Sequence, residues 1–242
     1  MKSNRYDSWP LGPVPAEKSR NEIEELRACG YVINDPRDAV TLFEKKISDF
    51  AGAKYCVLVD CCTHALLLSL RYLIEIGELR AGEVVEIPAQ TYGSVPMVLK
   101  QLNLVSKFVD SEWKGLYQVG NTRVWDAAVR WTEGMYVGDN SLQALSFQMK
   151  KRVPIGKGGA IITDDKEAAE WIKLASYDGR DLSKPYTDPE HFRMVGYHYY
   201  MTPEDAARGI ILMDKTPRHN EDSAGNCNYP DLREYSLFRE PT

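Results

Sequence analysis

Two residues that could do covalent chemistry stand beside short apolar runs of the chain. Asp126 ends the apolar pair 124–125, and Lys151 lies between the run 144–148 and the glycine-rich stretch 156–159. A buried carboxylate needs a partner, for which a protonated pyridine nitrogen is suitable. A nucleophilic lysine needs a lowered pKa, which burial and neighbouring cations supply. The two residues therefore predict a Schiff-base lysine that works beside a carboxylate.

Two further segments predict a site for a planar, phosphorylated ligand. In open α/β sheets, ligands bind at the carboxyl ends of strands and phosphates bind at helix N-termini. Thr63 follows the predicted strand 54–60 and is expected to be the N-cap of the next helix, with its hydroxyl and backbone facing an anion. Tyr92 follows the predicted strand 84–89, where its ring could stack on a flat cofactor.

Each of these segments, taken alone, also has a plain structural interpretation. Thr63 could be an ordinary helix cap, and Asp126 could cap the turn that follows it. Tyr92 could belong to the core or its rim, and Lys151 could belong to a solvated basic loop. The order of the four segments along the chain is what favours a common site.

The elements that must position these residues alternate between strands and helices. Short apolar runs predict strands at 54–60, 84–89, 105–109, 116–119, 123–127, 144–148 and 160–163. Apolar residues at helical spacing predict helices at 15–28, 37–51, 63–76, 95–102, 166–176 and 202–213. This alternation is typical of an α/β fold with a mostly parallel sheet. Residues 216–242 carry little apolar periodicity and predict an extended tail.

Composition limits the classes of function. The chain has 242 residues, enough for one large domain, and its formal net charge of −5 argues against a basic face that binds nucleic acid. The longest aliphatic run, 65–68, is too short to span a membrane, and the polar start does not resemble a signal peptide. The five cysteines are odd in number and lack C-x-x-C spacing, which predicts neither a disulfide framework nor a metal site. Adjacent Cys61 and Cys62 favour a reducing, cytoplasmic location.

With these residues in this order, the chain resembles the DegT/DnrJ/EryC1/StrS family of sugar aminotransferases, which are pyridoxal-phosphate enzymes of fold type I. Members typically carry a Ser/Asn-Gly-Thr turn, a Pro-x-x-Thr-Phe/Tyr segment, Asp-Ala-Ala, and Ser-Phe-x-x-x-Lys followed by Gly-x-Gly-Gly. The corresponding segments here are 61–63, 88–92, 126–128, 146–151 and 156–159. The resemblance covers roughly residues 36–213.

The resemblance implies a role for each matching residue. Lys151, five residues after Ser146, would form the Schiff base with pyridoxal 5′-phosphate, and Asp126 would bind the pyridine nitrogen. Tyr92 would cover the ring. The phosphate ligands would lie at Cys62, Thr63 and Ser146, with His198 reaching across from the second subunit of a homodimer that shares its active sites.

The resemblance also implies a domain plan. A three-layer large domain at 36–213 would bind the cofactor, preceded by an N-terminal segment at 1–35 and followed by a short tail at 214–242. Members usually carry a further C-terminal domain of over a hundred residues, so the small domain would be reduced here. Three more departures are Cys62 for the usual Gly, Val129 for a Gln, and His198 for the Asn of Asn-Tyr-Arg.

The expected activity is a transaminase reaction. The resemblance implies transfer of an amino group, from a donor such as glutamate, to a keto-sugar that is linked to a nucleotide. Two alternatives stay open: a non-catalytic relative that binds cofactor or sugar, and another pyridoxal-phosphate enzyme such as a sugar dehydratase. Related dehydratases carry histidine in place of the lysine, so Lys151 favours the aminotransferase.

Overall fold

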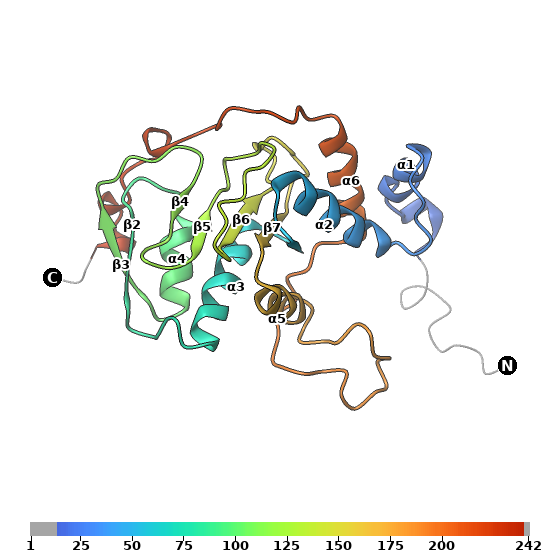
Figure 1. The fold of residues 1–242 in the computed structure, drawn as a ribbon, viewed down its shortest axis with the longest axis horizontal. Coiled ribbons are helices and arrows are strands. Elements are labelled where there is room, and N and C mark those ends of the chain that lie inside the picture. The colour runs from blue at the N-terminus through green and yellow to red at the C-terminus, as the bar shows by residue number, and fades with distance from the viewer. Residues whose placement is uncertain (1–13, 240–242) are drawn as a thin grey trace.

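A five-stranded sheet forms the centre of the molecule (Figure 1). The structure, a computed structural model, describes residues 14–239, so parts of the expected N-terminal segment and tail, 1–13 and 240–242, lie outside the described residues. The strand order is β1-β7-β6-β5-β4, and two more strands, β2 and β3, pair separately. The strands are β1 (Tyr55–Val59), β2 (Val84–Pro88), β3 (Val105–Val109), β4 (Tyr117–Gln118), β5 (Val124–Asp126), β6 (Leu142–Ser146) and β7 (Gly159–Thr163).

The α/β class is confirmed, but the sheet is mixed rather than mostly parallel. β5 pairs with β6 and β2 with β3 in parallel, whereas β1–β7, β6–β7 and β4–β5 are antiparallel. The reason lies in the connections, because parallel neighbours need a crossover and short connections return the chain antiparallel. β7 follows β6 through the loop 147–158 without a helix, and β5 follows β4 through the turn 119–123.

Helices cover both faces of the sheet and make the expected three layers. On β1, Val57 and Val59 face a core shared with α3, α4 and α5, whereas Cys56 and Leu58 face a core shared with α1, α2 and α6. Such alternation follows from the two-residue period of a strand. The helices are α1 (Glu22–Ala28), α2 (Asp38–Ala51), α3 (Cys62–Glu75), α4 (Ser94–Gln101), α5 (Lys166–Ser176) and α6 (Pro203–Asp214).

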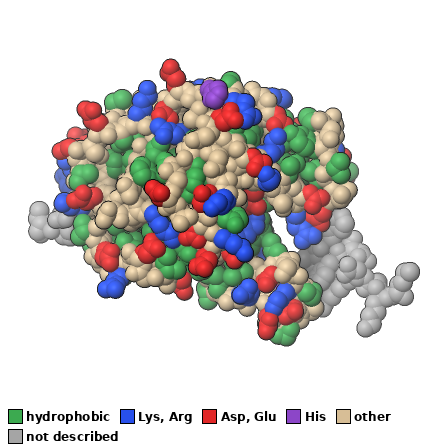
Figure 2. Space-filling view, viewed as in Figure 1, with side chains coloured by type: hydrophobic (Ala, Val, Ile, Leu, Met, Phe, Trp, Pro, Cys, Tyr) green, Lys and Arg blue, Asp and Glu red, His purple; other side chains and the backbone are tan. Residues whose placement is uncertain are grey.

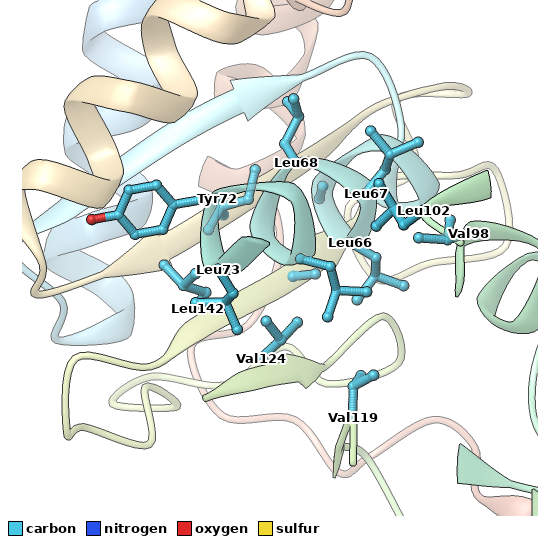
Figure 3. Close-up of a cluster of buried hydrophobic side chains, with 14 of the residues drawn as sticks. Leu66, Leu67, Leu68, Tyr72, Leu73, Val98, Leu102, Val119, Val124 and Leu142 are labelled. Carbon is cyan, nitrogen blue, oxygen red and sulfur yellow. The ribbon is translucent and has the colours of Figure 1, made fainter. Parts of the chain in front are cut away.

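Helix α3 is the most deeply buried of the helices that bear on the site. Its residues 65–70 are all buried, so the helix is apolar on nearly every side. Figure 3 shows Leu66 and Leu73 lying against Val124 and Leu142 of the neighbouring strands. Full burial of one leucine side chain contributes about 1.5–3 kcal/mol, so this layer anchors the start of α3 firmly.

Element boundaries differ from the predicted ones in a few places. The strand expected at 144–148 is β6, two residues earlier, and the helix expected at 15–28 splits into a 3-10 turn (Ala16–Lys18) and α1. Helix α6 begins as its sequence predicts, since the Thr202 side chain accepts a hydrogen bond from the Asp205 N–H and Pro203 occupies the first turn.

The C-terminal segment is not a free tail, although it lacks apolar periodicity. It contains short 3-10 turns at Asn226–Asn228, Leu232–Glu234 and Ser236–Phe238. Asp222 forms a two-pronged ion pair with Arg130, with separations of 2.9 and 2.7 Å. Buried Leu232 donates its N–H to the Ala89 carbonyl at 2.9 Å. The segment therefore passes along the β4, β2 and β3 side of the domain (Figure 1).

The surface carries charges of both signs. On the face shown in Figure 2, acidic and basic side chains are interspersed over most elements. Within residues 14–239, no helix has the length and apolar character needed to cross a membrane.

One close approach in this fold gives a stability prediction. A Cβ atom at Gly159 of β7 would lie 2.5 Å from the Cys61 carbonyl carbon and 2.6 Å from the Cys62 nitrogen. Gly159→Ala should therefore lower the free energy of unfolding by about 1–3 kcal/mol, as overpacking does. Gly93→Ala is the matched control, because Gly93 has φ −60° and a Cβ added at this position would meet open space among the described residues.

Urea denaturation of both variants checks this prediction. Gly93→Ala should stay within about 1 kcal/mol of the parent. Equal stability of the two variants would contradict the tight contact between β7 and α3.

Candidate active site

Asp126 lies at the carboxyl end of β5 with only 7% of its surface exposed. Its Oδ1 accepts the Ala128 N–H at 3.0 Å, and its Oδ2 accepts the Tyr117 hydroxyl at 3.0 Å. Burial raises the pKa of the Asp126 carboxyl, while these two donors and the nearby Lys151 ammonium oppose the shift. A carboxylate here is thus a strong acceptor that a cationic N–H donor would stabilise.

A hydroxyl relay holds this carboxylate in place. The Tyr117 hydroxyl that bonds Asp126 lies 2.6 Å from the Thr91 Oγ1, and both side chains are buried. Burial raises the pKa of the Tyr117 hydroxyl well above its usual value, and the charge of Asp126 raises it further. Tyr117 therefore remains a neutral donor. The relay was not found from the sequence, because Tyr117 on β4 looks there like an ordinary strand residue.

Lys151 is half-buried in the loop that joins β6 to β7. Its backbone N–H donates to the Gln148 carbonyl at 2.8 Å. Its ammonium is close enough to influence the pKa of both Asp126 and Cys62. The adjacent Lys150 is exposed, and its N–H is bonded to the Gln148 side chain. Of the two neighbouring lysines, Lys151 is the less exposed, and it is the one that influences the Asp126 carboxyl.

The first turn of α3 lies beside these residues. The helix N-cap is Cys61, in extended conformation and without a side-chain capping hydrogen bond, so the expectation that Thr63 would be the N-cap is corrected. Thr63 lies within the first turn, where its Oγ1 donates to the Ser94 Oγ at 3.0 Å. The helix begins one residue earlier than predicted, at Cys62, and strand β1 also ends one residue earlier, at Val59. Ser94, at the start of α4, was not predicted as part of the site.

Gly159 links this helix start to the end of β6. Its strand partner is Ser146, and its backbone packs on the Cys61–Cys62 peptide. Ser146 therefore lies near the first turn of α3, as its expected part in phosphate binding requires. Burial raises the pKa of the Cys62 thiol well above its usual value, with Asp126 adding to the rise and Lys151 opposing it. The Cys62 side chain is thus a neutral thiol beside the first turn of α3.

Two tyrosines border the same region. Tyr92 is 63% exposed, at the rim rather than in the core. Tyr229, in the C-terminal segment, is half-buried and its ring lies 5.7 Å from that of Trp113. Burial raises the pKa of the Tyr229 hydroxyl, and Asp126, Cys62 and Tyr92 add to the rise, so the hydroxyl lies within electrostatic range of these groups. No sequence signal pointed to Tyr229, because the segment around it lacks periodicity.

His198 lies outside this group of residues. Its side chain is 71% exposed, and its Nδ1 lies 3.2 and 3.1 Å from the two carboxylate oxygens of Asp178. The ring also contacts Tyr200 edge-on, at 4.6 Å between centroids. Within one chain, His198 therefore contacts none of the predicted phosphate ligands.

The residues that are brought together fit pyridoxal phosphate. Asp126 is a buried carboxylate whose oxygens can each accept a further hydrogen bond. The uncapped first turn of α3 offers backbone N–H groups to a phosphate, beside the hydroxyls of Thr63 and Ser94. Half-buried Lys151 acts electrostatically on Asp126 at one end of the site and on Cys62 at the other.

The chain is similar in sequence to known proteins. The model of the DegT/DnrJ/EryC1/StrS aminotransferase family matches residues 15–120 and 126–229. Spore coat polysaccharide biosynthesis protein SpsC of Bacillus subtilis is 26% identical over 74% of the chain and 55% of its own length. GDP-4-keto-6-deoxy-D-mannose 3-dehydratase of Yersinia pseudotuberculosis is 21% identical over 84% of the chain and 67% of its own length.

A solved structure shows the same fold. AtS13 from Actinomadura melliaura superimposes with a TM-score of 0.65 at 20% identity, over 80% of this chain and 64% of that one. The chain thus spans between about half and two thirds of the length of the relatives it matches. Since the family match extends over most of its residues, the chain belongs to the DegT/DnrJ/EryC1/StrS aminotransferase family, whose members depend on pyridoxal phosphate.

Proposed function

We propose that the chain is a pyridoxal-phosphate-dependent aminotransferase that transfers an amino group, from a donor such as glutamate, to a nucleotide-linked keto-sugar. The observation that carries the proposal is half-buried Lys151 within electrostatic range of the buried carboxylate of Asp126. Membership of the family supports the reaction class. The similarity to a dehydratase that is named for a GDP-linked keto-sugar supports the substrate class.

In this proposal the two ends of the site bind different parts of the cofactor. Thr63, Ser146 and the first-turn amides of α3 hold the phosphate, with Cys62 contributing through its backbone. Asp126 accepts a hydrogen bond from the pyridine nitrogen, and Tyr92 covers the ring from the rim. Residues 36–213 would supply these groups as the cofactor-binding domain. Pyridoxal phosphate, when bound, supplies an aldehyde carbon for a covalent link and a ring that withdraws electrons from the substrate carbon.

The protein groups then perform three tasks. Lys151 would hold the cofactor covalently through its Nζ. When this amine is free, it can take up a proton and return it to the substrate carbon. Asp126 would keep the pyridine nitrogen of the cofactor positively charged, because a cationic partner stabilises its buried carboxylate. Tyr117 and the Ala128 N–H fix the orientation of that carboxylate.

A sugar dehydratase is the second candidate, because a relative with that name matches 84% of the chain. Lys151 favours the aminotransferase, since a lysine can both bind the cofactor and return a proton to the substrate carbon. The two activities are distinguished by their products: one gives an amino-sugar, and the other a deoxy-sugar.

The covalent link gives the first prediction for this site. Borohydride treatment of the cofactor-loaded protein should fix the cofactor on Lys151, and Lys151→Ala should abolish the label. Transamination should fall at least about 100-fold in this variant, because the base that moves the proton is lost. Lys150→Ala is the matched control, an exposed lysine one residue away, and should keep both label and activity.

Peptide mapping by mass spectrometry checks the position of the label. A label on Lys150, or none in cofactor-saturated protein, would overturn the assignment and with it the proposed function.

The hydroxyl relay gives the second prediction. In cofactor-free protein, Tyr117→Phe should lower the free energy of unfolding by about 1.5–3 kcal/mol at neutral pH, because a charged acceptor loses its donor. The folded-state pKa of Asp126 is raised, so its ionised carboxylate destabilises the fold at pH values above that pKa. This destabilisation disappears as the pH falls, because the carboxyl is then protonated. The cost of Tyr117→Phe should therefore shrink in acid.

Urea denaturation at several pH values measures this dependence. In an Asp126→Asn background, the same Tyr117→Phe change should cost less, because no charge remains to be stabilised. An equal cost in both backgrounds and at every pH would mean that the hydroxyl only fills space.

Sharing of the active site between subunits gives the third prediction. His198, exposed on its own chain, is proposed to donate a hydrogen bond to the cofactor phosphate of the second subunit in a homodimer. Lys151→Ala and His198→Ala chains should each be weakly active. After mixing, half the dimers are mixed and each has one intact site, so about a quarter of the parental activity should return.

The matched control is His219→Ala, which removes another exposed histidine and should leave activity unchanged. An active monomer in solution, or no recovery despite proven exchange of subunits, would show that His198 does not act across an interface.

A further inference from the structure

A cluster of three different donor side chains lies at the junction of β1 and α3. The carboxylate of Asp60, the thiol of Cys61 and the imidazole of His64 each place a donor atom within 4.8 Å of the other two. Asp60 Oδ1 and His64 Nδ1 are 2.5 Å apart. All three side chains are only partly exposed, and the Cys61 thiol is free. The sequence alone gave no metal signal here, because one cysteine and one histidine match no C-x-x-C pattern.

The backbone that carries the three donors is fixed from several sides. The Asp60 N–H donates to the Tyr199 carbonyl at 2.7 Å. The Cys61–Cys62 peptide is in close contact with Gly159. The His64 ring stacks on the Tyr199 ring, with centroids 3.6 Å apart and planes at 12°. A preorganised set of donors is what a metal site needs, because little ordering is then required on binding.

The cluster occupies a different side of α3 from the proposed phosphate ligands. Thr63 points toward Ser94 of α4, whereas His64 folds back onto Asp60 and Tyr199. Successive residues of a helix point about 100° apart, which explains how neighbours in sequence face two sites.

We propose that Asp60, Cys61 and His64 bind one divalent transition metal ion of the zinc type. Thiolate, imidazole and carboxylate together form a borderline-soft donor set that suits zinc, unlike the all-oxygen sets of magnesium and calcium. The thiolate and carboxylate balance the two charges of the ion. Three protein ligands leave a fourth tetrahedral position for water. The proposal is independent of the cofactor chemistry.

Binding requires one small rearrangement. With zinc bonds of about 2.0–2.2 Å at a tetrahedral angle, ligating nitrogen and oxygen are about 3.4 Å apart, so the 2.5 Å between His64 and Asp60 opens by roughly 1 Å. Side-chain rotation of Asp60 provides that movement. Lys157 Nζ lies 2.9 Å from the other oxygen, Asp60 Oδ2, and remains there as an outer partner that orients the carboxylate.

The test measures zinc on tag-free, cofactor-loaded protein after chelation, re-equilibration with micromolar zinc chloride and gel filtration. About one zinc per chain is expected for the parent by elemental mass spectrometry. Cys61→Ser should weaken binding at least about tenfold, because even an outer partner of a metal site is worth about 10- to 100-fold in affinity. Serine is a preferred N-cap residue, so this variant keeps the start of α3 folded.

Three further measurements make the outcome decisive. Cys227→Ser removes an exposed cysteine outside the cluster and should bind zinc as the parent does. Lys151→Ala should also bind zinc normally, since the site does not involve the cofactor lysine. Replacement of zinc by Co²⁺ should give the visible bands of tetrahedral thiolate coordination in the parent and not in Cys61→Ser. Absence of stoichiometric zinc in the parent, or equal affinity of Cys61→Ser and Cys227→Ser, would overturn the proposal.

Discussion

The contact between β7 and the first peptide of α3 is the constraint on which the site depends. Gly159 has no side chain, so its backbone reaches the Cys61–Cys62 peptide, where a Cβ would be 2.5 Å from the nearest atom. The same glycine pairs with Ser146 on β6. Strand β6 in turn pairs with β5, which ends at Asp126. The absence of a side chain at Gly159 thus allows the start of α3, Ser146 and Asp126 to lie in a common region.

The burial of Asp126 shows how the protein tolerates a buried charge at the candidate site. A buried carboxylate destabilises a fold unless it is paired. Here the Tyr117 hydroxyl and the Ala128 N–H offset part of that cost, and the nearby ammonium of Lys151 offsets more. The raised pKa of the Asp126 carboxyl indicates that the compensation is incomplete. A cationic ligand would complete it, so under the proposed function the unfavourable part of the fold would contribute to affinity for the cofactor.

Local sequence patterns predicted those parts of the site that follow directly from strand ends. Asp126 and Lys151 each stand after an apolar run, and their types and order pointed to a shared function. Tyr117, Ser94 and Tyr229 were missed, because their contacts join segments far apart in the chain and leave no periodic signal. The strand directions were misjudged at β7 for a related reason. Alternating strands and helices predict crossovers, but the loop between β6 and β7 contains no helix and reverses the chain.

The C-terminal segment has a consequence for the order in which the molecule is completed during translation. The sheet and α6 are synthesised before residues 222–232 leave the ribosome. Until then, Arg130 lacks Asp222 and the Ala89 carbonyl lacks the Leu232 N–H. The contacts of the C-terminal segment therefore form on a sheet whose strands have already been synthesised. A cofactor that binds before this segment docks would meet a side of the candidate site that lacks the Asp222 and Leu232 contacts.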